Sequence, residues 1–133
     1  MPLSHPDPWV NVLRGYVTEA VEAIDEHGLV VARSWLDPRD PRDATIIFSH
    51  PAAVTELGLV WDEVTGWRCG IFESGAQGVR TVLSDTRYLG GALLLSGQDL
   101  AGRVLAGAAE PRREHRSVAD RHDGLDDSLL ARN

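Results

Sequence analysis

The chain has a single cysteine, Cys69, and no lysine among its 133 residues. One cysteine cannot form an internal disulfide or supply a cluster of thiolate ligands, which excludes disulfide scaffolds and zinc fingers. Without lysine, Schiff-base chemistry and a phosphate-loop lysine are also excluded, since both depend on the compact amine of that residue. All thirteen basic residues are arginine, which indicates codon bias from a GC-rich genome.

Long apolar runs and net positive charge are missing as well. No apolar run approaches the roughly 20 residues that span a bilayer, and residues 1–8 lack the basic and apolar regions of a secretory signal. The formal charge of -7 argues against a nucleic-acid surface, because binding to phosphates needs a basic face. We therefore expect a cytoplasmic protein with neither a membrane nor a nucleic-acid partner, and a basic or neutral partner instead.

The patterning that is present is that of one globular domain. Asp7 and Pro8 form a helix-start signal, and apolar residues then recur every three or four positions up to Gly28, which predicts a helix over 8–27. Two β-rich runs, 29–36 and 44–49, are separated by a loop with two prolines, which predicts an antiparallel pair. The segment 49–57 is expected to form one or two helical turns.

The stretch "LVWDEVTGWRCG" predicts a hairpin. Apolar residues alternate with a period of two on both sides of a turn that ends in glycine, so Trp61 and Trp67 are expected to lie close together on one face. The same alternation leaves Asp62 and Glu63 at a solvent-facing bend rather than in a cleft.

The second half of the chain predicts one more strand at 79–84, a bend or short strand at 87–95, and a helix at 97–109 that begins with the S-x-x-D signal of Ser96. The fold class is therefore α+β, with an antiparallel sheet of four to five strands and both helices on one face. The other face, with Val60 and Phe72, is expected to be solvated or paired, and to be a dimer or partner site if it is apolar.

The organisation that follows has three parts: a flexible N-terminus (1–7), one domain (8–110) and a largely disordered charged tail (111–133). The tail has few large apolar groups with which to offset its ordering entropy. Leu125, Leu129 and Leu130 are the exception, and are expected to form a short helix that docks on a partner or a neighbouring copy.

Residues with reactive side chains each have a simpler interpretation. Asp62 and Glu63 are adjacent and point opposite ways, whereas the carboxylate pair of a glycosidase faces across a cleft. Cys69 alternates with apolar residues and is expected in the core. The five histidines include no pair at metal-ligand spacing. We therefore expect no catalytic residue, no metal site and no cofactor.

The sequence instead favours a binding surface made of an aromatic, a guanidinium and exposed backbone amides, because Tyr, Trp and Arg are common interface anchors. Its residues are Trp35, Trp67, Arg87, Tyr88, Gly90 and Gly91. The competing interpretation is that Tyr88 and Leu89 only close the end of the core while the glycines turn the chain.

The hairpin "LVWDEVTGW", the run "VRTVLSDTRYLGG" and the closing helix "DLAGRVLAG" resemble an uncharacterised actinobacterial family, domain of unknown function 6292. The likeness covers 8–109 loosely and 59–105 more closely. It implies a fold and no reaction. The order of elements is also similar to that of small type III secretion chaperones, which bind other proteins, but this is an analogy of fold only.

Two functions remain open. The first is a non-enzymatic binding or adaptor protein that acts through a protein partner or as a homodimer. The alternative is a small enzyme or ligand-binding protein of a biosynthetic pathway, with a small molecule held in an apolar pocket between helix and sheet. A pocket of roughly 300 Å³ or more with converging polar groups would favour the alternative.

Overall fold

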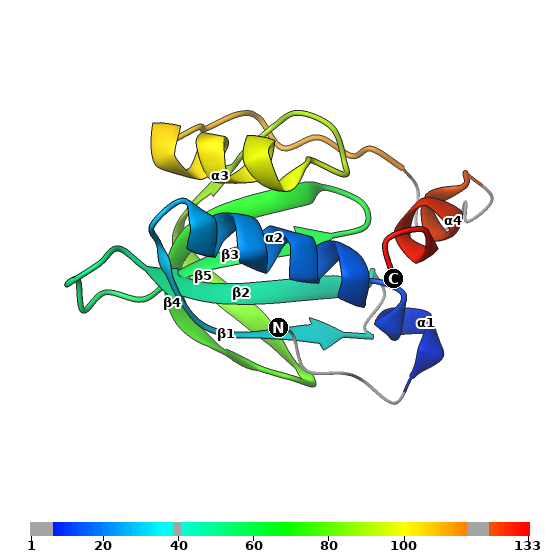
Figure 1. Ribbon diagram of the computed structural model, residues 1–133, viewed down its shortest axis with the longest axis horizontal. Coiled ribbons are helices and arrows are strands. Elements are labelled where there is room, and N and C mark those ends of the chain that lie inside the picture. Colours follow the sequence, from blue (N-terminus) through cyan, green and yellow to red (C-terminus); the bar gives the residue numbers. More distant parts are fainter. Residues whose placement is uncertain (1–6, 39–40, 117–122) are drawn as a thin grey trace.

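The structure is a computed structural model, and it describes residues 7–38, 41–116 and 123–133 (Figure 1). The expected flexible start lies outside the described residues, except for Asp7, whose carboxylate accepts a hydrogen bond from the amide of Trp9. No helix in the described part of the chain is long and apolar enough to cross a membrane. The elements in chain order are α1 (Pro8–Asn11), α2 (Arg14–Glu26), β1 (Val30–Asp37), β2 (Asp43–Ser49), β3 (Leu57–Asp62), β4 (Gly66–Ala76), β5 (Val79–Tyr88), α3 (Gly97–Ala106) and α4 (Leu125–Leu130).

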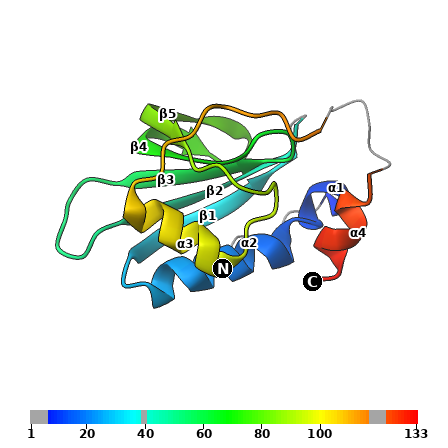
Figure 2. The ribbon, with the colours of Figure 1, turned by 90° about the horizontal axis from the view of Figure 1, so that it is seen from above.

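The fold is α+β, as predicted. The five strands form one antiparallel meander in the order β1-β2-β3-β4-β5, and α2 and α3 cover one face of it (Figures 1 and 2). The hairpin of β3 and β4 has the expected register, with Trp61 opposite Trp67. β5 continues to Tyr88 instead of ending near residue 84, so the chain bends only at the two glycines that follow.

Apolar side chains of α2 and α3 fill the space above the sheet. The helices lie close together at Gly97, where an added Cβ would be 2.7 Å from the Cβ of Ala23. Ser96 caps α3 by accepting a hydrogen bond from the amide of Asp99 at 3.1 Å, as the S-x-x-D signal predicts. The buried set includes Tyr16, Val17, Ala20, Val21, Ile24, Leu36, Ala44, Ile46, Phe48, Leu59, Trp61, Trp67, Leu100, Ala101 and Val104.

The opposite face of the sheet is covered by the protein's own β4–β5 hairpin. The pairing of these two long strands shifts register at three places, and the hairpin lies on the side of the sheet away from the helices (Figure 2). The hydroxyls of Thr45 in β2 and Thr81 in β5 are 2.7 Å apart, although the two strands are not neighbours in the sheet. Val60, which we expected on a solvated or dimer-forming face, is fully buried.

Two glycines allow the hairpin to curl over the sheet. At Gly58 an added Cβ would lie 2.6 Å from the end of the Leu83 side chain, and at Gly70 it would lie 2.6 Å from the backbone oxygen of Ser84. Trp35 packs edge-on against Phe72 beneath the hairpin, with ring centroids 6.4 Å apart. The second face is therefore a small core within the same chain.

Two helical predictions were only partly right. The expected helix over 8–27 is divided into α1 and α2 by a turn at Val12 and Leu13. The segment after β2 forms a tight turn rather than a helix, closed by a hydrogen bond from the amide of Ala53 to the oxygen of His50 at 3.1 Å. Ala52 has a φ of 64°, a conformation that cannot continue a right-handed helix.

The segment after Pro111 differs most from the expectation of a loose tail. Residues 111–116 run past the β3–β4 turn, where the amide of His115 donates to the oxygen of Val64 at 2.7 Å. The short helix predicted from the three leucines is present as α4, and it docks on its own chain rather than on a partner (Figure 1). Leu125 and Leu129 join the main core. Residues 117–122 lie outside the described part of the chain.

The close approach at Gly15 explains a residue that is unfavourable inside a helix. An added Cβ there would collide with the backbone oxygen of Arg132, and the amide of Gly15 donates to Asn133 Oδ1 at 2.7 Å. Glycine at this position therefore lets the segment after α4 pack directly against α2.

Candidate functional site

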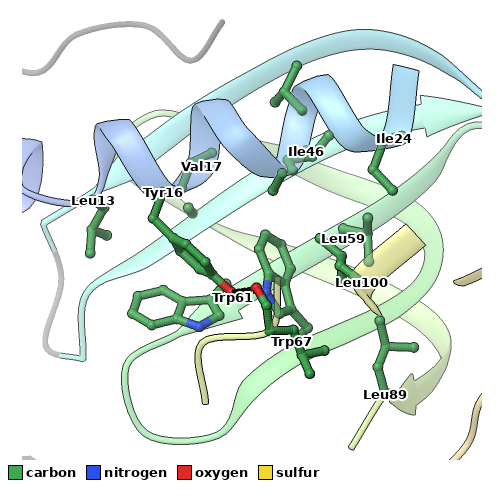
Figure 3. Packing of buried hydrophobic residues seen from close by; sticks show 14 of the residues in the cluster. Leu13, Tyr16, Val17, Ile24, Ile46, Leu59, Trp61, Trp67, Leu89 and Leu100 are labelled. Carbon is green, nitrogen blue, oxygen red and sulfur yellow. Dashed lines mark hydrogen bonds between the residues drawn. The ribbon is translucent and has the colours of Figure 1, made fainter. Parts of the chain in front are cut away.

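Trp61 and Trp67 belong to a buried aromatic cluster with Tyr16 of α2 (Figure 3). The Trp67 indole N–H donates to the Tyr16 hydroxyl at 3.0 Å, and that hydroxyl donates to the oxygen of Leu95 at 2.7 Å. The Trp61 indole N–H donates to the oxygen of Leu93 at 2.9 Å. Burial raises the pKa of Tyr16. Every polar atom in this chain of bonds has a partner, so the cluster fixes the 93–95 segment against the core.

The prediction that the two acids between the tryptophans face solvent was wrong. Asp62 and Glu63 are 8% and 0% exposed, respectively. Asp62 accepts hydrogen bonds from the amides of Val64 and Thr65, at 2.8 and 2.7 Å, and pairs with Arg68 at 2.9 Å. These bonds close the turn that the sequence predicted, but the carboxylate is turned into the protein because the backbone amides that it satisfies lie there.

Glu63 is the centre of a buried ionic network. Arg42 binds its carboxylate through Nε and Nη2, both at 2.9 Å, and through its backbone amide at 2.7 Å, and Arg116 adds a further contact at 2.8 Å. Arg42 also donates to the oxygen of Trp9 at 2.9 Å and pairs with Asp126 of α4 at 2.6 Å. The network joins α1, the β1–β2 loop, the β3–β4 turn and the C-terminal segment.

This network has a structural role rather than a catalytic one. Glu63 and the side chain of Arg42 are almost fully buried, and the carboxylate is held by two guanidinium groups. A carboxylate enclosed in this way is out of reach of a substrate. The two acids also make separate sets of bonds, so they do not act as a pair.

A second group of acids lies at the same end of the sheet. Asp37, Asp43 and Asp62 are opposite one another across β1, β2 and β3. Burial raises the pKa of Asp43 to about 7, and the charges of Asp37 and Asp62 add to this effect, while Arg80 and Arg68 oppose it. Among the described residues, no group of three or more acids, histidines or cysteines is placed to hold a metal ion.

Cys69 is buried in the core as expected. Burial raises the pKa of its thiol, and the positive charge of Arg87 opposes this only in part. A thiol in this setting is a poor nucleophile, because the reactive form is the thiolate.

The six residues predicted to form a binding surface do not lie together. Trp67 is in the helix-side core, and Trp35 is beneath the β4–β5 hairpin on the opposite face. Arg87 donates to the oxygens of Ala108 and Val104, at 2.7 and 3.3 Å, near the C-terminal end of α3. This is a favourable position for a cation at a helix C-terminus. The prediction overlooked that Arg87 and its neighbour in β5 point to opposite faces of the sheet.

The remaining three predicted residues, Tyr88, Gly90 and Gly91, line one surface cavity of about 430 Å³. Both glycines have positive φ, at 74° and 78°. At Gly90 an added Cβ would lie 2.5 Å from Glu110 Cγ, and at Gly91 it would lie 3.0 Å from the Arg103 guanidinium carbon. The bend therefore needs glycine for close packing as well as for its backbone conformation.

Arginines surround this cavity. Arg103, Arg112 and Arg113 line it, together with His115, and Glu110 is the one carboxylate among the described residues of the lining. Burial and the charge of Arg113 lower the pKa of His115, so this imidazole is neutral near pH 7. A second cavity of about 400 Å³ adjoins the first and shares Thr65, Tyr88 and Arg112 with it.

Three of these residues were missed at the level of sequence. Arg112, Arg113 and His115 lie in the segment expected to be disordered, and no periodic pattern marks them. The sequence carries no signal for them. The structure brings this segment to the bend through an isolated β-bridge between Tyr88 and Glu110.

The comparisons with known proteins identify a family. The model described as "Family of unknown function (DUF6292)" matches residues 16–106, more than half of the chain. The match includes α2 from Tyr16 onward, all five strands and α3, and it leaves out α1, α4 and the segment that carries Arg112, Arg113 and His115. No curated protein and no solved structure matches, so the likeness to type III secretion chaperones stays a prediction. The chain belongs to DUF6292, a family of unknown function.

Proposed function

We propose that this chain is a non-enzymatic binding or adaptor protein of an actinobacterium that acts in the cytoplasm through protein–protein contacts. The observation that carries the proposal is the surface cavity at Tyr88, Gly90 and Gly91, which three arginines line. Tyr and Arg are among the residues that contribute most to protein interfaces. The acids best placed by sequence to do chemistry, Asp62 and Glu63, are instead committed to internal arginines.

The packing of the core also favours this function over an enzyme with an apolar pocket. The side chains between the helices and the sheet are buried and touch one another (Figure 3). A cavity of about 320 Å³ does lie where α2 meets β1. Its polar groups include the exposed carboxylates of Glu22 and Asp25, and Arg33, which is paired with Glu56. The cavity has the size expected of a small-molecule site, but its carboxylates are exposed and its guanidinium is already paired, so its polar groups do not converge on a ligand.

A homodimer through the sheet is not favoured, because the β4–β5 hairpin already covers the face that we expected to be open. The partner is therefore proposed to be a different protein, bound at the Tyr88 cavity.

Site-specific photo-crosslinking in the native cell tests the proposal. A photoreactive phenylalanine at Tyr88 is expected to give a discrete adduct with one other protein, and an Arg112→Gln/Arg113→Gln background is expected to abolish it. The matched control places the same group at Val54, which is 97% exposed on the loop between β2 and β3. The absence of an adduct at position 88, or the same adducts from both positions, contradicts the proposal.

A further inference from the structure

The cavity at Tyr88 and the adjoining cavity of about 400 Å³ form one surface groove that is rich in arginine, called here the arginine groove. It is the combined lining of the two cavities that share Thr65, Tyr88 and Arg112. Five arginines contribute to it: Arg68, Arg80, Arg103, Arg112 and Arg113. The carboxylates in the same lining are Asp62, Glu110 and Glu114. The groove is thus positive in a chain whose formal charge is -7.

Most of the arginines in the groove are not neutralised by a buried carboxylate of the same chain. Arg113 makes no hydrogen bond or ion pair with the described residues. Arg112 pairs with Glu114 at 3.1 Å, but both side chains are more than half exposed, and such surface pairs are weak. Arg103 donates Nη1 to the oxygen of Leu89, which is a neutral acceptor. Within the described part of the chain, Arg68 is the one groove arginine that pairs with a mostly buried carboxylate, that of Asp62.

We infer that the arginine groove binds an acidic, extended peptide segment of the partner protein, in place of the basic or neutral partner that the net charge of the chain had led us to expect. This inference rests on the proposed function and names the chemistry of the partner. Guanidinium groups present planar forks of N–H donors that match carboxylates. Several of them spread along two adjoining cavities fit a chain that carries a carboxylate at intervals.

Other anionic ligands fit the groove less well. A small-molecule site is usually an enclosed and mostly apolar cavity, whereas eight of the sixteen described residues that line the two cavities of this groove are charged. The nearest helix N-terminus, that of α3, is already capped by Ser96 and lines neither cavity. A nucleic acid carries a denser run of negative charge than a peptide with carboxylates at intervals, so the net charge of the chain disfavours it more strongly.

Fluorescence anisotropy with defined peptides tests the inference on the full chain. The probe is a rhodamine-labelled peptide of alternating glutamate and serine, and the matched probe replaces each glutamate with glutamine. The glutamate peptide is expected to bind and the glutamine peptide is not. The double variant R112Q/R113Q is expected to weaken binding by about tenfold, since it removes two exposed cations from the groove.

The matched control is R33Q/R132Q, which removes two positive charges from places outside the groove. It is expected to change the affinity by no more than about twofold. Equal losses in both double variants would show a non-specific charge effect and overturn the inference. Binding of the glutamine peptide, no binding of either peptide, or displacement by inorganic phosphate at a lower concentration than by the unlabelled peptide would overturn it too.

The two experiments fail separately. A crosslinked partner at position 88 together with no affinity for the acidic peptide would leave the proposed function standing and remove the acidic segment. The absence of an adduct at position 88 would contradict both the proposed function and the acidic segment.

Discussion

The two faces of the sheet are held by different kinds of contact. The face beneath α2 and α3 is packed with large apolar side chains, and its few polar atoms bond to one another. The opposite face combines apolar side chains such as Trp35 and Val60 with a buried pair of threonines, and the end near the β3–β4 turn depends on a row of aspartates and the Glu63 network. An apolar core tolerates substitutions that conserve its volume, whereas a buried ion pair is strongly destabilising when one partner is removed.

The largest expected effect is on the polar side. Glu63→Gln should lower the free energy of unfolding by about 3–5 kcal/mol, because it leaves Arg42 and Arg116 buried without their shared carboxylate. Urea unfolding measures the loss, and Glu73→Gln, at an exposed carboxylate, is the matched control. Hydrogen exchange in α4 should rise in the Glu63 variant. A loss as small as that of the control would show that the network does not hold the fold.

A pair of leucine truncations compares the two faces directly. Leu59→Ala, on the helix side, should cost about 2–5 kcal/mol, since the side chain is fully buried. Leu83→Ala, on the hairpin that covers the other face, should cost less, because that residue is only partly buried. Thermal or urea unfolding of the two variants measures the difference. Equal losses would mean that the two faces contribute alike.

Asp43 makes the polar region sensitive to pH. The pKa of this carboxyl rises from 3.8 to about 7 on folding, so the folded chain holds the proton more tightly than the unfolded chain between these values. The contribution of Asp43 to stability is therefore complete below about pH 4 and is lost as the pH rises through 7. The change amounts to roughly 2–4 kcal/mol. Asp43→Asn should remove this slope from the free energy of unfolding measured against pH, and an unchanged slope would contradict the assignment.

The smallest expected effects are at glycines that shape the hairpin. Gly70→Ala should cost about 1–3 kcal/mol, because its Cβ would meet the backbone oxygen of Ser84. Gly58→Ala should cost less, since its Cβ would meet only the movable end of the Leu83 side chain. Gly102→Ala is the control, at an open helical position, and should stabilise the chain by up to about 1 kcal/mol. A larger loss of unfolding free energy for Gly58→Ala than for Gly70→Ala would contradict the close approach at Gly70.

The apolar side could be predicted from sequence and the polar side could not. Periods of two and of three to four placed Trp67 and the buried faces of α2 and α3 correctly, because burial of apolar groups is a local property of the pattern. The environment of Glu63 depends on Arg42 and Arg116, which are 21 and 53 residues away in the chain. No local signal connects residues at such separations.

The candidate site shows the same division. The sequence suggested Tyr88 and the two glycines as a binding surface, and the structure places all three in one cavity. The sequence also grouped them with Trp35, Trp67 and Arg87. That grouping was wrong because neighbouring side chains of β5 point to opposite faces of the sheet, and because the β4–β5 hairpin covers Trp35 on the face opposite Trp67. Two of the three arginines that line the cavity, Arg112 and Arg113, come from a segment that was expected to be loose.

The most direct test of the arginine groove as the binding site is a nuclear magnetic resonance titration of the isotope-labelled chain with the glutamate–serine peptide. The account predicts that the largest shifts are in the amides of Thr65, Tyr88, Gly90 and Gly91 and in the arginine Nε–H groups of the groove, with Val54 unmoved. Shifts centred on the acidic surface of α2, or spread evenly over the molecule, would contradict it.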